Sequence, residues 1–519
     1  MNHNEMAVRR IVIMGGGTAG WLTAGILAAR FPERGESGID ITLVESPGRA
    51  PIGVGEGTWP TLRTTLREMG VSETDFIREC EVSFKQGSQF IGWCRGGDES
   101  YLHPFMPPAG WEGEALPPYW LEAANERSFA ESVCPQTSPC LAGLAPKQIT
   151  TPEYAGLVNY AYHINAGKLS DFLRRHCTEK LHVSHLLEEI VRIDSEESGE
   201  IRALCTATGA TIEADLYVDC SGLSARIIGQ HFGVPLLEQN RVLFVDRAWV
   251  TQATHPQPDA AIASATLATA QNAGWIWDIG LPSRRGIGHA YSAAYVTDDI
   301  ALEQLQQYLR ERNLFTDELA FRKLTFVPGY RREFWVRNCV AVGLSAGFLE
   351  PLEASAIVMV ELAAQMLANL LPRRRASMNY TAKLFNETFA YRWRRVIDFL
   401  KLHYVLSNRT DSDFWRDNRS AWSIPAELAD RIEFWRSQCP WHDDFQSRNE
   451  VFSAASYQYV LYGMGFATAT PSWTLSERGR ASAREQFEQA RLQAVELMAA
   501  LPTNRDLLER INRFGLQRI

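Results

Sequence analysis

The sequence predicts an α/β protein that has a doubly wound, dinucleotide-binding region and a helical C-terminal region. Two observations favour the α/β part. A short apolar run ends in three glycines at 15–17, and a second apolar run follows at 40–45 after a segment rich in alanine and leucine. This order of strand, helix and strand is the unit from which parallel sheets are built. Beyond about residue 372 the pattern turns helical, so we expect two regions, 1–371 and 372–519.

The first β-α-β unit is expected from strands at residues 9–14 and Asp40–Glu45, with a helix over Trp21–Arg30 between them. Residues 104–118 are rich in proline, which predicts a loop. Apolar and polar residues alternate over Ile212–Asp219, which predicts a further strand.

A buried strand at Val340–Leu344 and a long helix after it are also expected. The helical segment Ala354–Leu371 is apolar enough to resemble a membrane span, but it carries Glu361, Gln365 and Asn369 at four-residue spacing. That spacing places the polar groups in one stripe, so we expect a buried helix.

Composition excludes several classes of partner. The 519 residues carry a formal charge of -9 and a pI near 5.8, which argues against a nucleic-acid partner or an anionic membrane. The nine cysteines are odd in number and form no Cys-x-x-Cys pair, so we predict no metal site and expect reduced thiols in a cytoplasm. Met1–Arg10 lacks the apolar run of a signal peptide.

The glycines after the first strand have separate mechanical roles. Gly15 permits a tight turn, Gly17 lets the backbone approach a pyrophosphate, and Gly20 lets the helix pack closely on the strand. The N-terminus of the helix then offers amide donors to the phosphates. Glu45, at the end of the second strand, is placed to bind a ribose hydroxyl. The turn predicts nucleotide binding, and FAD and NAD remain equally open from it alone.

Five linked motifs narrow this prediction. They are Gly15–Trp21, Pro51–Thr58, Phe84-Lys85, Gly274–Ile279 and Phe348–Glu353, and Leu501–Asn504 near the C-terminus adds a sixth. Together they resemble the flavin-dependent tryptophan halogenase family over essentially the whole chain. The resemblance implies the FAD-binding fold of flavoprotein monooxygenases and halogenases.

The same resemblance implies the cofactors. FAD would be supplied as FADH2 by a separate flavin reductase, because the chain has no reductase module, and oxygen with chloride or bromide would give hypohalous acid. The segment Pro51–Thr58 would form a strap over the flavin. Besides Gly15, Gly17, Gly20 and Glu45, the residues implied to contact FAD are Thr18, Ala19, Gly53, Val54, Ile190, Leu344 and Ile357.

Lys85 and Glu353 match the positions of the family's catalytic lysine and glutamate. An ammonium could hold and aim hypohalous acid or become a haloamine, and the residues leave both routes open. A carboxylate could stabilise the cationic ring of the substrate and accept its proton. We expect Glu353 in the first turn of a helix, with the amides of Ser355 and Ala356 binding the halide.

Trp275 and Trp277 lie one residue apart on an expected strand, so their indoles point to the same face. The resemblance implies that they form a barrier between the flavin and the substrate. Such a barrier would let hypohalous acid pass and would keep the substrate from the flavin.

The expected substrate residues are His103, Phe105, Phe452 and Ser456. His103 and Phe105 keep the His-x-Phe motif of the family. Tryptophan-acting members bind the amino-acid end of tryptophan with a Tyr-Tyr pair, a Glu, a Trp and an Asn. Here Phe452 and Ser456 replace the last two, and no Tyr-Tyr-Glu precedes them. We therefore predict a small electron-rich aromatic such as indole or a substituted indole as the substrate, not free tryptophan.

Two other functions remain open. A single-component aromatic hydroxylase would also begin with a glycine-rich turn, although no second nucleotide motif is found. A flavin-binding protein without catalytic activity is the other alternative. The sequence leaves the oligomeric state open, a homodimer included.

Overall fold

The computed structural model describes residues 7–35, 38–48, 55–113, 115–123, 127–445, 447–471, 473 and 475–518. The expected flavin contacts Gly53 and Val54 lie outside these residues, and so does the first half, 51–54, of the Pro51–Thr58 motif.

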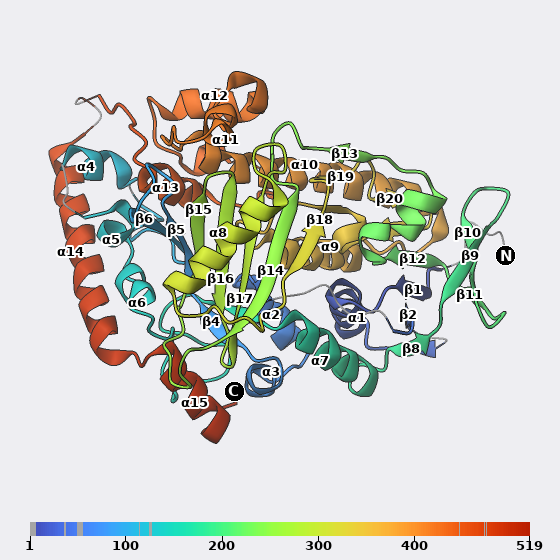
Figure 1. The fold of residues 1–519 in the computed structure, drawn as a ribbon. Coiled ribbons are helices and arrows are strands. Elements are labelled where there is room, and N and C mark those ends of the chain that lie inside the picture. The colour runs from blue at the N-terminus through green and yellow to red at the C-terminus, as the bar shows by residue number, and fades with distance from the viewer. Residues whose placement is uncertain are drawn as a thin grey trace.

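A six-stranded sheet carries the dinucleotide-binding turn. Its order is β20-β21-β12-β1-β2-β8, and every neighbouring pair is parallel except β20 with β21. The strands are β20 (Trp335–Val336), β21 (Cys339–Ala341), β12 (Leu216–Asp219), β1 (Arg10–Met14), β2 (Asp40–Glu45) and β8 (Ser184–Leu187). Helix α1 (Thr18–Arg30) joins β1 to β2, so the predicted β-α-β unit is confirmed. Figure 1 shows this sheet near the N-terminus.

The strand predicted over Ile212–Asp219 is wrong in one respect, because two strands replace it. β11 (Thr211–Glu213) belongs to a small sheet with β10 (Ile201–Thr206) and β9 (Ile190–Ser195), whereas β12 belongs to the large one. Asp215 lies between them, and its carboxylate accepts hydrogen bonds from the backbone amides of Arg9 and Arg10 at 2.9 and 2.8 Å. These bonds fix the point at which the chain passes from one sheet to the other.

The strand predicted over Val340–Leu344 is shorter than expected, since β21 ends at Ala341 and a 3-10 turn follows over Gly343–Ser345. Gly343 adopts φ +74, and a Cβ there would lie 2.7 Å from the Cβ of Ala19. The turn therefore lets the chain approach the start of α1.

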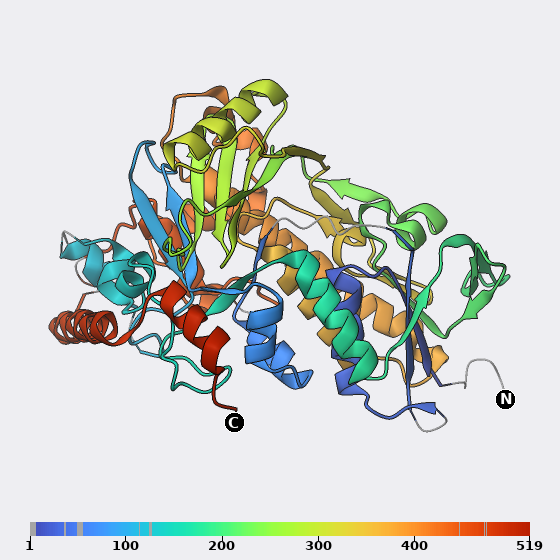
Figure 2. The same cartoon turned by 60° about the horizontal axis from the view of Figure 1, so that its bottom comes forward.

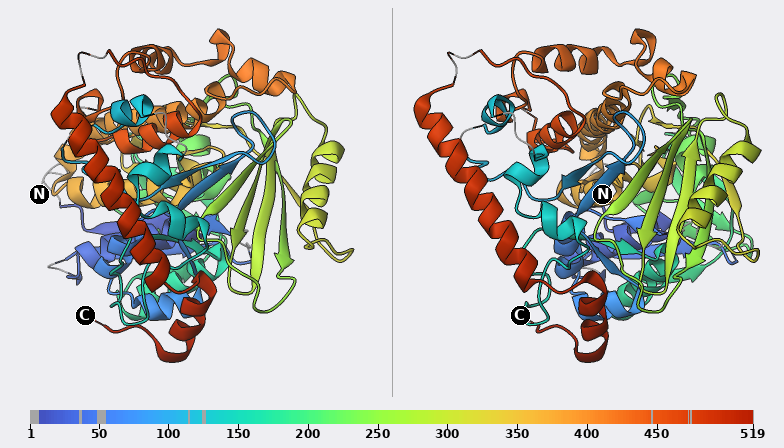
Figure 3. Two further views of the ribbon diagram at one scale, coloured as in Figure 1. Left: turned by 90° about the vertical axis from the view of Figure 1, so that its left-hand side faces the viewer. Right: turned by 60° about the vertical axis from the view of Figure 1, so that its left-hand side comes forward.

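A second, seven-stranded sheet forms the centre of the molecule. Its order is β18 (Arg322–Thr325), β14 (Arg247–Thr254), β17 (Arg284–Tyr291), β16 (Gly274–Gly280), β15 (Thr266–Gln271), β5 (Gly87–Ile91) and β6 (Ser100–Pro104). Helix α8 (Asp298–Glu311) packs on β14 and β17. Both views in Figure 3 show α8 on one side of the molecule and α14 (Glu477–Ala500) on the other.

Two small sheets complete the strands. One has the order β3 (Glu56–Gly57), β7 (Ala161–Ile164) and β4 (Ser83–Lys85), and it brings Lys85 into the core. The other contains β13 (Leu236–Glu238), β19 (Gly329–Arg331) and β22 (Gly347–Phe348). Besides α1, the α-helices described in the first half of the chain are α2 (Thr61–Glu68), α3 (Glu73–Glu79), α4 (Pro117–Glu122), α5 (Phe129–Val133), α6 (Thr137–Leu141) and α7 (Ala166–Glu179).

After β22 the described elements are helices. They are α9 (Ser355–Leu370), α10 (Met378–Val405), α11 (Asp413–Asn418), α12 (Ala426–Trp435), α13 (Ala454–Gly463), α14 and α15 (Asn504–Phe514), with short 3-10 turns between some of them. The C-terminal helix α15 packs against α3 and β4, far away in the sequence, and Figure 2 shows α15 beside α3.

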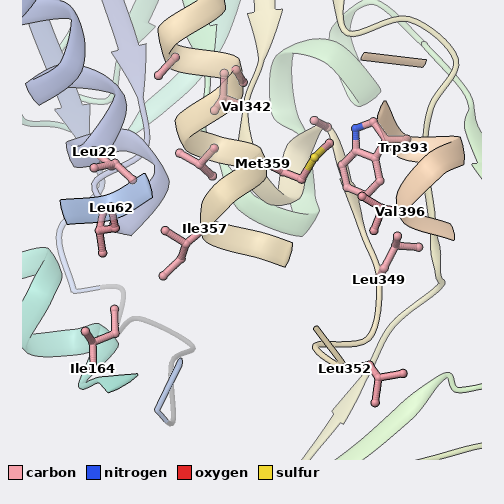
Figure 4. Packing of buried hydrophobic residues seen from close by; sticks show 14 of the residues in the cluster. Leu22, Leu62, Ile164, Val342, Leu349, Leu352, Ile357, Met359, Trp393 and Val396 are labelled. Carbon is pink, nitrogen blue, oxygen red and sulfur yellow. The ribbon is translucent and has the colours of Figure 1, made fainter. Parts of the chain in front are cut away.

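Helix α9 is buried, as the sequence predicts. Its Glu361 is 1% exposed and accepts hydrogen bonds from Thr61 at 3.1 Å and Thr65 at 2.6 Å, so the polar stripe meets α2. Figure 4 shows Ile357 of α9 turned toward Leu22 and Leu62, and Met359 turned toward Trp393 of α10. None of the described helices has both the length and the apolar character needed to cross a membrane.

Candidate functional site

The glycine turn between β1 and α1 has the geometry that the sequence predicts. Gly15 adopts φ +125, and a Cβ there would meet the carbonyl oxygen of Cys220 at 2.2 Å. A Cβ on Gly20 would meet the carbonyl oxygen of Gly15 at 1.8 Å, so this glycine allows the helix to approach the turn. A Cβ on Gly17 would have nothing within 4 Å. Gly17 caps α1 without a side-chain bond, so the first amides of the helix face open space.

A cavity of about 570 Å³ begins at this turn. That volume is typical of a cofactor or ligand site. The expected cofactor residues that line it are Gly15, Gly17, Thr18, Ala19, Glu45, Ile190, Leu344 and Ile357. Glu45 lies at the end of β2, and its carboxylate is 3.0 Å from Nε2 of His185. An open glycine cradle, uncapped helix amides and a carboxylate at the end of the second strand fit an adenine dinucleotide.

Lys85 lies at another part of the same cavity. It ends β4, which pairs with β7, and the adjacent Phe84 is held by Asn504. The side-chain amide of Asn504 donates to the carbonyl oxygen of Phe84 at 2.9 Å and accepts from its amide at 3.3 Å. Asn504 thus bonds to β4 as a neighbouring strand would, which gives the Leu501–Asn504 motif a structural role in placing Lys85.

The surroundings of the Lys85 ammonium are tight and largely apolar. Lys85 is 1% exposed, and its Nζ lies 5.4 Å from the ring centre of Phe105. A Cβ on Gly57 would lie 3.0 Å from the same nitrogen and 3.5 Å from the hydroxyl of Thr266. Burial lowers the pKa of Lys85 from 10.5 to about 8, although the Glu353 carboxylate acts in the opposite direction. Both protonation states of this amine are therefore accessible near neutral pH.

Glu353 precedes α9 and does not lie in its first turn, so that expectation is wrong. The helix begins at Ser355 because Ala354 adopts a left-handed conformation with φ 53 and ψ 39. Leu352 and Ala354 line the cavity, whereas the carboxylate of Glu353 contacts His103 and His403. The left-handed residue thus lets Leu352 and Ala354 line the cavity while the side chain of Glu353 contacts the two histidines.

The Glu353 carboxylate is 4% exposed and strongly bonded. Its Oε1 lies 2.9 Å from Nδ1 of His103 and 3.1 Å from Nε2 of His403. Burial alone would raise the pKa of Glu353, but His103 and His403 together lower it to about 2. The group is therefore a carboxylate at neutral pH, next to a lysine whose positive charge it favours.

The amides proposed to bind halide do lie at the start of a helix. Ser355 and Ala356 are the first two residues of α9, and both line the cavity. The cap residue is Ala354, whose methyl group has no oxygen with which to bond these amides. Backbone donors and the positive end of the helix dipole therefore meet at the cavity wall, which suits an anion.

The two tryptophans of β16 have different surroundings. Their ring centres are 6.0 Å apart, and of the two only Trp277 lines the cavity. The Trp277 ring covers Gly288, where a Cβ would lie 2.2 Å from it. Trp275 is fully buried, and its indole nitrogen donates to Glu350 at 2.6 Å. Trp277 therefore forms part of the wall of the cavity, and the ring of Trp275 packs against it.

Two of the four expected substrate residues contact Glu353 or Lys85. His103 bonds Glu353, and Phe105 faces Lys85. Phe452 is 2% exposed and stacks on Phe399, with ring centres 3.8 Å apart. Ser456 lies on the next turn of chain, in α13, and is partly buried.

Several residues of the site have no signal in the sequence. His403 and Phe399 come from the long helix α10, where they resemble ordinary core positions. Thr266 on β15 lies 2.8 Å from His163 of β7, and burial followed by the Lys85 charge lowers the pKa of that imidazole. These groups meet only through tertiary structure.

Comparisons with known proteins agree with this geometry. The model of the tryptophan halogenase family matches residues 10–478. The tryptophan 6-halogenase ThaL of Streptomyces albogriseolus is 30% identical over 97% of this chain and 99% of its own. A crystal structure of a tryptophan halogenase from Shewanella frigidimarina NCIMB 400 is 43% identical over all of both chains, with a TM-score of 0.96. BrvH, a flavin-dependent halogenase from Brevundimonas sp. BAL3, is 32% identical over 97% of this chain and 99% of its own, with a TM-score of 0.86. A glycine cradle, a buried lysine on the same cavity and these matches along the whole chain lead to one conclusion: the chain belongs to the tryptophan halogenase family of flavin-dependent enzymes.

Proposed function

We propose that the protein uses FADH2, oxygen and chloride or bromide to form hypohalous acid, and that it halogenates an electron-rich aromatic such as indole or a substituted indole. The observation that carries this proposal is the position of Lys85. Its buried amine lines the cavity that begins at the dinucleotide turn, and it also faces Phe105 and interacts with Glu353. One group thus reaches both the oxidant and the arene.

The residues of the chain would divide the reaction between them. When bound, reduced FAD supplies the electrons with which oxygen and halide give hypohalous acid. Lys85 would hold this uncharged oxidant, as an ammonium donor or as a haloamine, and orient it toward the ring beside Phe105. Glu353 would stabilise the cationic ring and accept its proton. The wall that Trp277 forms would keep the arene from the cavity.

The contacts of Glu450 support a substrate that has no amino-acid end. Glu450 is the acidic residue of the stretch that precedes Phe452, and it accepts a hydrogen bond from Arg395 at 3.2 Å. Arg395 is 1% exposed and also bonds Asp398 at 2.7 Å. A carboxylate that is committed to a buried arginine cannot serve the ammonium of tryptophan without leaving that arginine partly unpaired. An arene without an amino-acid end avoids this cost.

We expect a separate flavin reductase to supply FADH2, as the family resemblance implies. We also propose the division into an FAD-binding region, 1–371, and a helical substrate-covering region, 372–519, to which Phe399, His403 and Phe452 belong. A homodimer remains a prediction for the assembly.

Mass spectrometry of an arene panel tests the function directly. The pure protein is incubated with FAD, a flavin reductase, NADH and either bromide or chloride, and indole, substituted indoles and free tryptophan compete in one mixture. We expect monohalogenated indoles as the main products and little halogenated tryptophan. Hydroxylated arenes, together with NADPH oxidation by the protein alone, would instead favour a single-component hydroxylase. The absence of any product with reduced FAD, oxygen and halide would support a flavin-binding protein without catalytic activity.

A further inference from the structure

Glu350 is a buried carboxyl group at which donors from two distant elements meet. The indole nitrogen of Trp275 on β16 donates to its Oε2 at 2.6 Å, and the hydroxyl of Tyr404 on α10 donates to the same oxygen at 2.6 Å. Both distances are shorter than the most common values for such bonds. All three side chains are at most 1% exposed. One oxygen thus joins the loop before α9 to the central sheet and to the long helix.

The other surroundings of Glu350 are largely aromatic. The ring of Trp93 packs on both donors, with its centre 6.4 Å from that of Trp275 and 5.2 Å from that of Tyr404. The second oxygen of Glu350, Oε1, is buried and has no hydrogen-bond partner among the residues that the structure describes. Burial raises the pKa of Glu350 to about 7, although Tyr404, Trp275 and Lys401 lower it. A carboxyl group is costly in such a core, so stability alone does not account for its presence.

The loop that carries Glu350 also carries Glu353 and borders the cavity. It spans residues 349–354 between β22 and α9, and Glu350 lies three residues before Glu353. The loop residues that line the cavity are Leu349, Pro351, Leu352 and Ala354. Near the end of the loop, the carbonyl oxygen of Glu353 accepts a hydrogen bond from the indole nitrogen of Trp59 at 2.8 Å. The loop is therefore held at two points, and Glu350 supplies the one that reaches the central sheet.

Trp275 connects Glu350 to the cavity wall. Its ring centre lies 6.0 Å from that of Trp277, and Trp277 lines the cavity and covers Gly288. The Trp277 ring is therefore packed between Gly288 on one side and the Trp275 ring on another. Because the indole nitrogen of Trp275 is bonded to Glu350, the carboxyl group fixes the ring against which Trp277 packs.

We propose that Glu350 is a positioning residue, which holds Trp275, and through it the Trp277 part of the cavity wall, against the loop that carries Glu353. The contact rests on geometry, whereas its role in turnover rests on the proposed function. Each FADH2 passes two electrons to one oxygen molecule, and the outcome is either hypohalous acid and water or hydrogen peroxide. If the wall is displaced, water enters the cavity and a larger share of FADH2 ends as peroxide. Glu350 thus acts on the coupling of FADH2 oxidation to halogenation.

Helix α9 contains a matched carboxyl group that does not hold the wall. Glu361 is 1% exposed, like Glu350, and it also accepts two hydrogen bonds, from Thr61 at 3.1 Å and Thr65 at 2.6 Å. Burial raises the pKa of Glu361 to about 7 as well. Its two donors belong to α2, so replacing Glu361 removes a comparable buried group and leaves the contacts of the tryptophans on β16 intact.

The ¹H–¹⁵N spectrum of protein labelled at the indoles of its 15 tryptophans tests the contact without any turnover. Trp275→Phe and Trp277→Phe assign the two indole signals of β16. We expect the Trp275 proton far downfield, because it lies in a short bond to a carboxyl oxygen. Glu350→Leu should move this signal upfield and should also move the Trp277 signal, whereas Glu361→Leu should move neither. An unchanged Trp277 signal in Glu350→Leu would overturn the proposal.

The amounts of bromoindole and peroxide formed per FADH2 oxidised test the role in turnover. Glu350→Leu should form less bromoindole, with peroxide making up the difference, whereas Glu361→Leu should leave both amounts unchanged even where it lowers Tm equally. Glu350→Gln should restore the wild-type amounts, because its amide oxygen can take the place of Oε2 and accept from both donors. Wild-type amounts in Glu350→Leu, or no recovery in Glu350→Gln, would reject the role.

Trp275→Phe keeps an aromatic ring and removes only the donor, so it tests the role even if Glu350→Leu fails to fold. It should release more peroxide than the wild type and should move the Trp277 signal. Wild-type peroxide release in Trp275→Phe would reject the role of the bond to Glu350. If the wild-type protein halogenates no arene, the proposed function fails, and the Trp277 signal still decides whether Glu350 holds the wall.

Discussion

Replacing Lys85 with methionine should stabilise the protein while it removes the amine. Lys85 is 1% exposed, and burial lowers its pKa from 10.5 to about 8 despite the nearby carboxylate. The ammonium is therefore more costly in the folded chain than in the unfolded chain. Methionine has a similar length and no charge, so the variant avoids that cost.

The size of this effect follows from the shift in pKa. A shift of about 2.5 units corresponds to about 3 kcal/mol, at about 1.4 kcal/mol per unit. Because the pKa is lowered on folding, the cost is complete below pH 8 and disappears as the pH rises toward 10.5. At about pH 9 it should be about 2 kcal/mol. For 519 residues, with an unfolding entropy of about 2 cal/mol/K per residue, 3 kcal/mol corresponds to about 3 °C in Tm.

Differential scanning calorimetry of the wild type and Lys85→Met at about pH 6.5 and about pH 9 measures this difference. We expect the variant to melt about 3 °C higher at the lower pH and about 2 °C higher at the higher pH. Lys383→Met is the control, because Lys383 is 68% exposed beside Glu387 and its charge costs little. If Lys85→Met melts at or below the wild-type temperature, the buried ammonium does not destabilise the folded protein. A difference in Tm that does not become smaller as the pH rises would contradict the same reasoning.

Further predictions concern the carboxylate of Glu353, the part of the cavity wall that Trp277 forms, and the placement of β4 by Asn504. Glu353→Gln should lower kcat by about 100-fold or more with FAD binding retained, because the amide cannot accept the proton of the arene. An unchanged rate of product formation would reject Glu353 as the general base. Gly288→Ala should displace the Trp277 ring and raise the amount of peroxide released per FADH2 oxidised. Gly280→Ala on β16 is the control and should leave that amount unchanged, because the nearest atom to the new Cβ is the Cγ2 methyl carbon of Ile262 at 3.2 Å. Asn504→Ala should lower the unfolding free energy by about 2 kcal/mol because the backbone of Phe84 loses two buried partners, and an unaltered Tm would contradict this.

The parts of the fold that the sequence predicts are those with local signals. The first β-α-β unit follows from a strand pattern and from Gly15 and Gly20, whose positions admit no side chain. The helix after Val340 follows from its apolar length and its polar stripe. The sequence placed the start of that helix too early, because the left-handed Ala354 determines it and alanine carries no preference for that conformation.

The site could be predicted only in part, because some of its residues come together only in the folded chain. Lys85 and Glu353 belong to recognisable motifs, and the structure places both beside Phe105 and His103. His403 is 50 residues from Glu353 and occupies a buried helix position that sequence cannot distinguish from core. The unequal roles of Trp275 and Trp277 likewise depend on Glu350 and Gly288, which meet them only in the folded chain.

We propose that the oxidant forms in the cavity that begins at the dinucleotide turn and reaches the arene through Lys85. The most direct test is a single-turnover reaction in which the protein, reduced FAD, bromide and indole meet oxygen, with and without a large excess of a water-soluble thioether that destroys free hypobromous acid. We expect that the yield of bromoindole is unaffected by the thioether and that it is lost in Lys85→Met. A yield that the thioether abolishes, or bromoindole that persists without the amine, would contradict it.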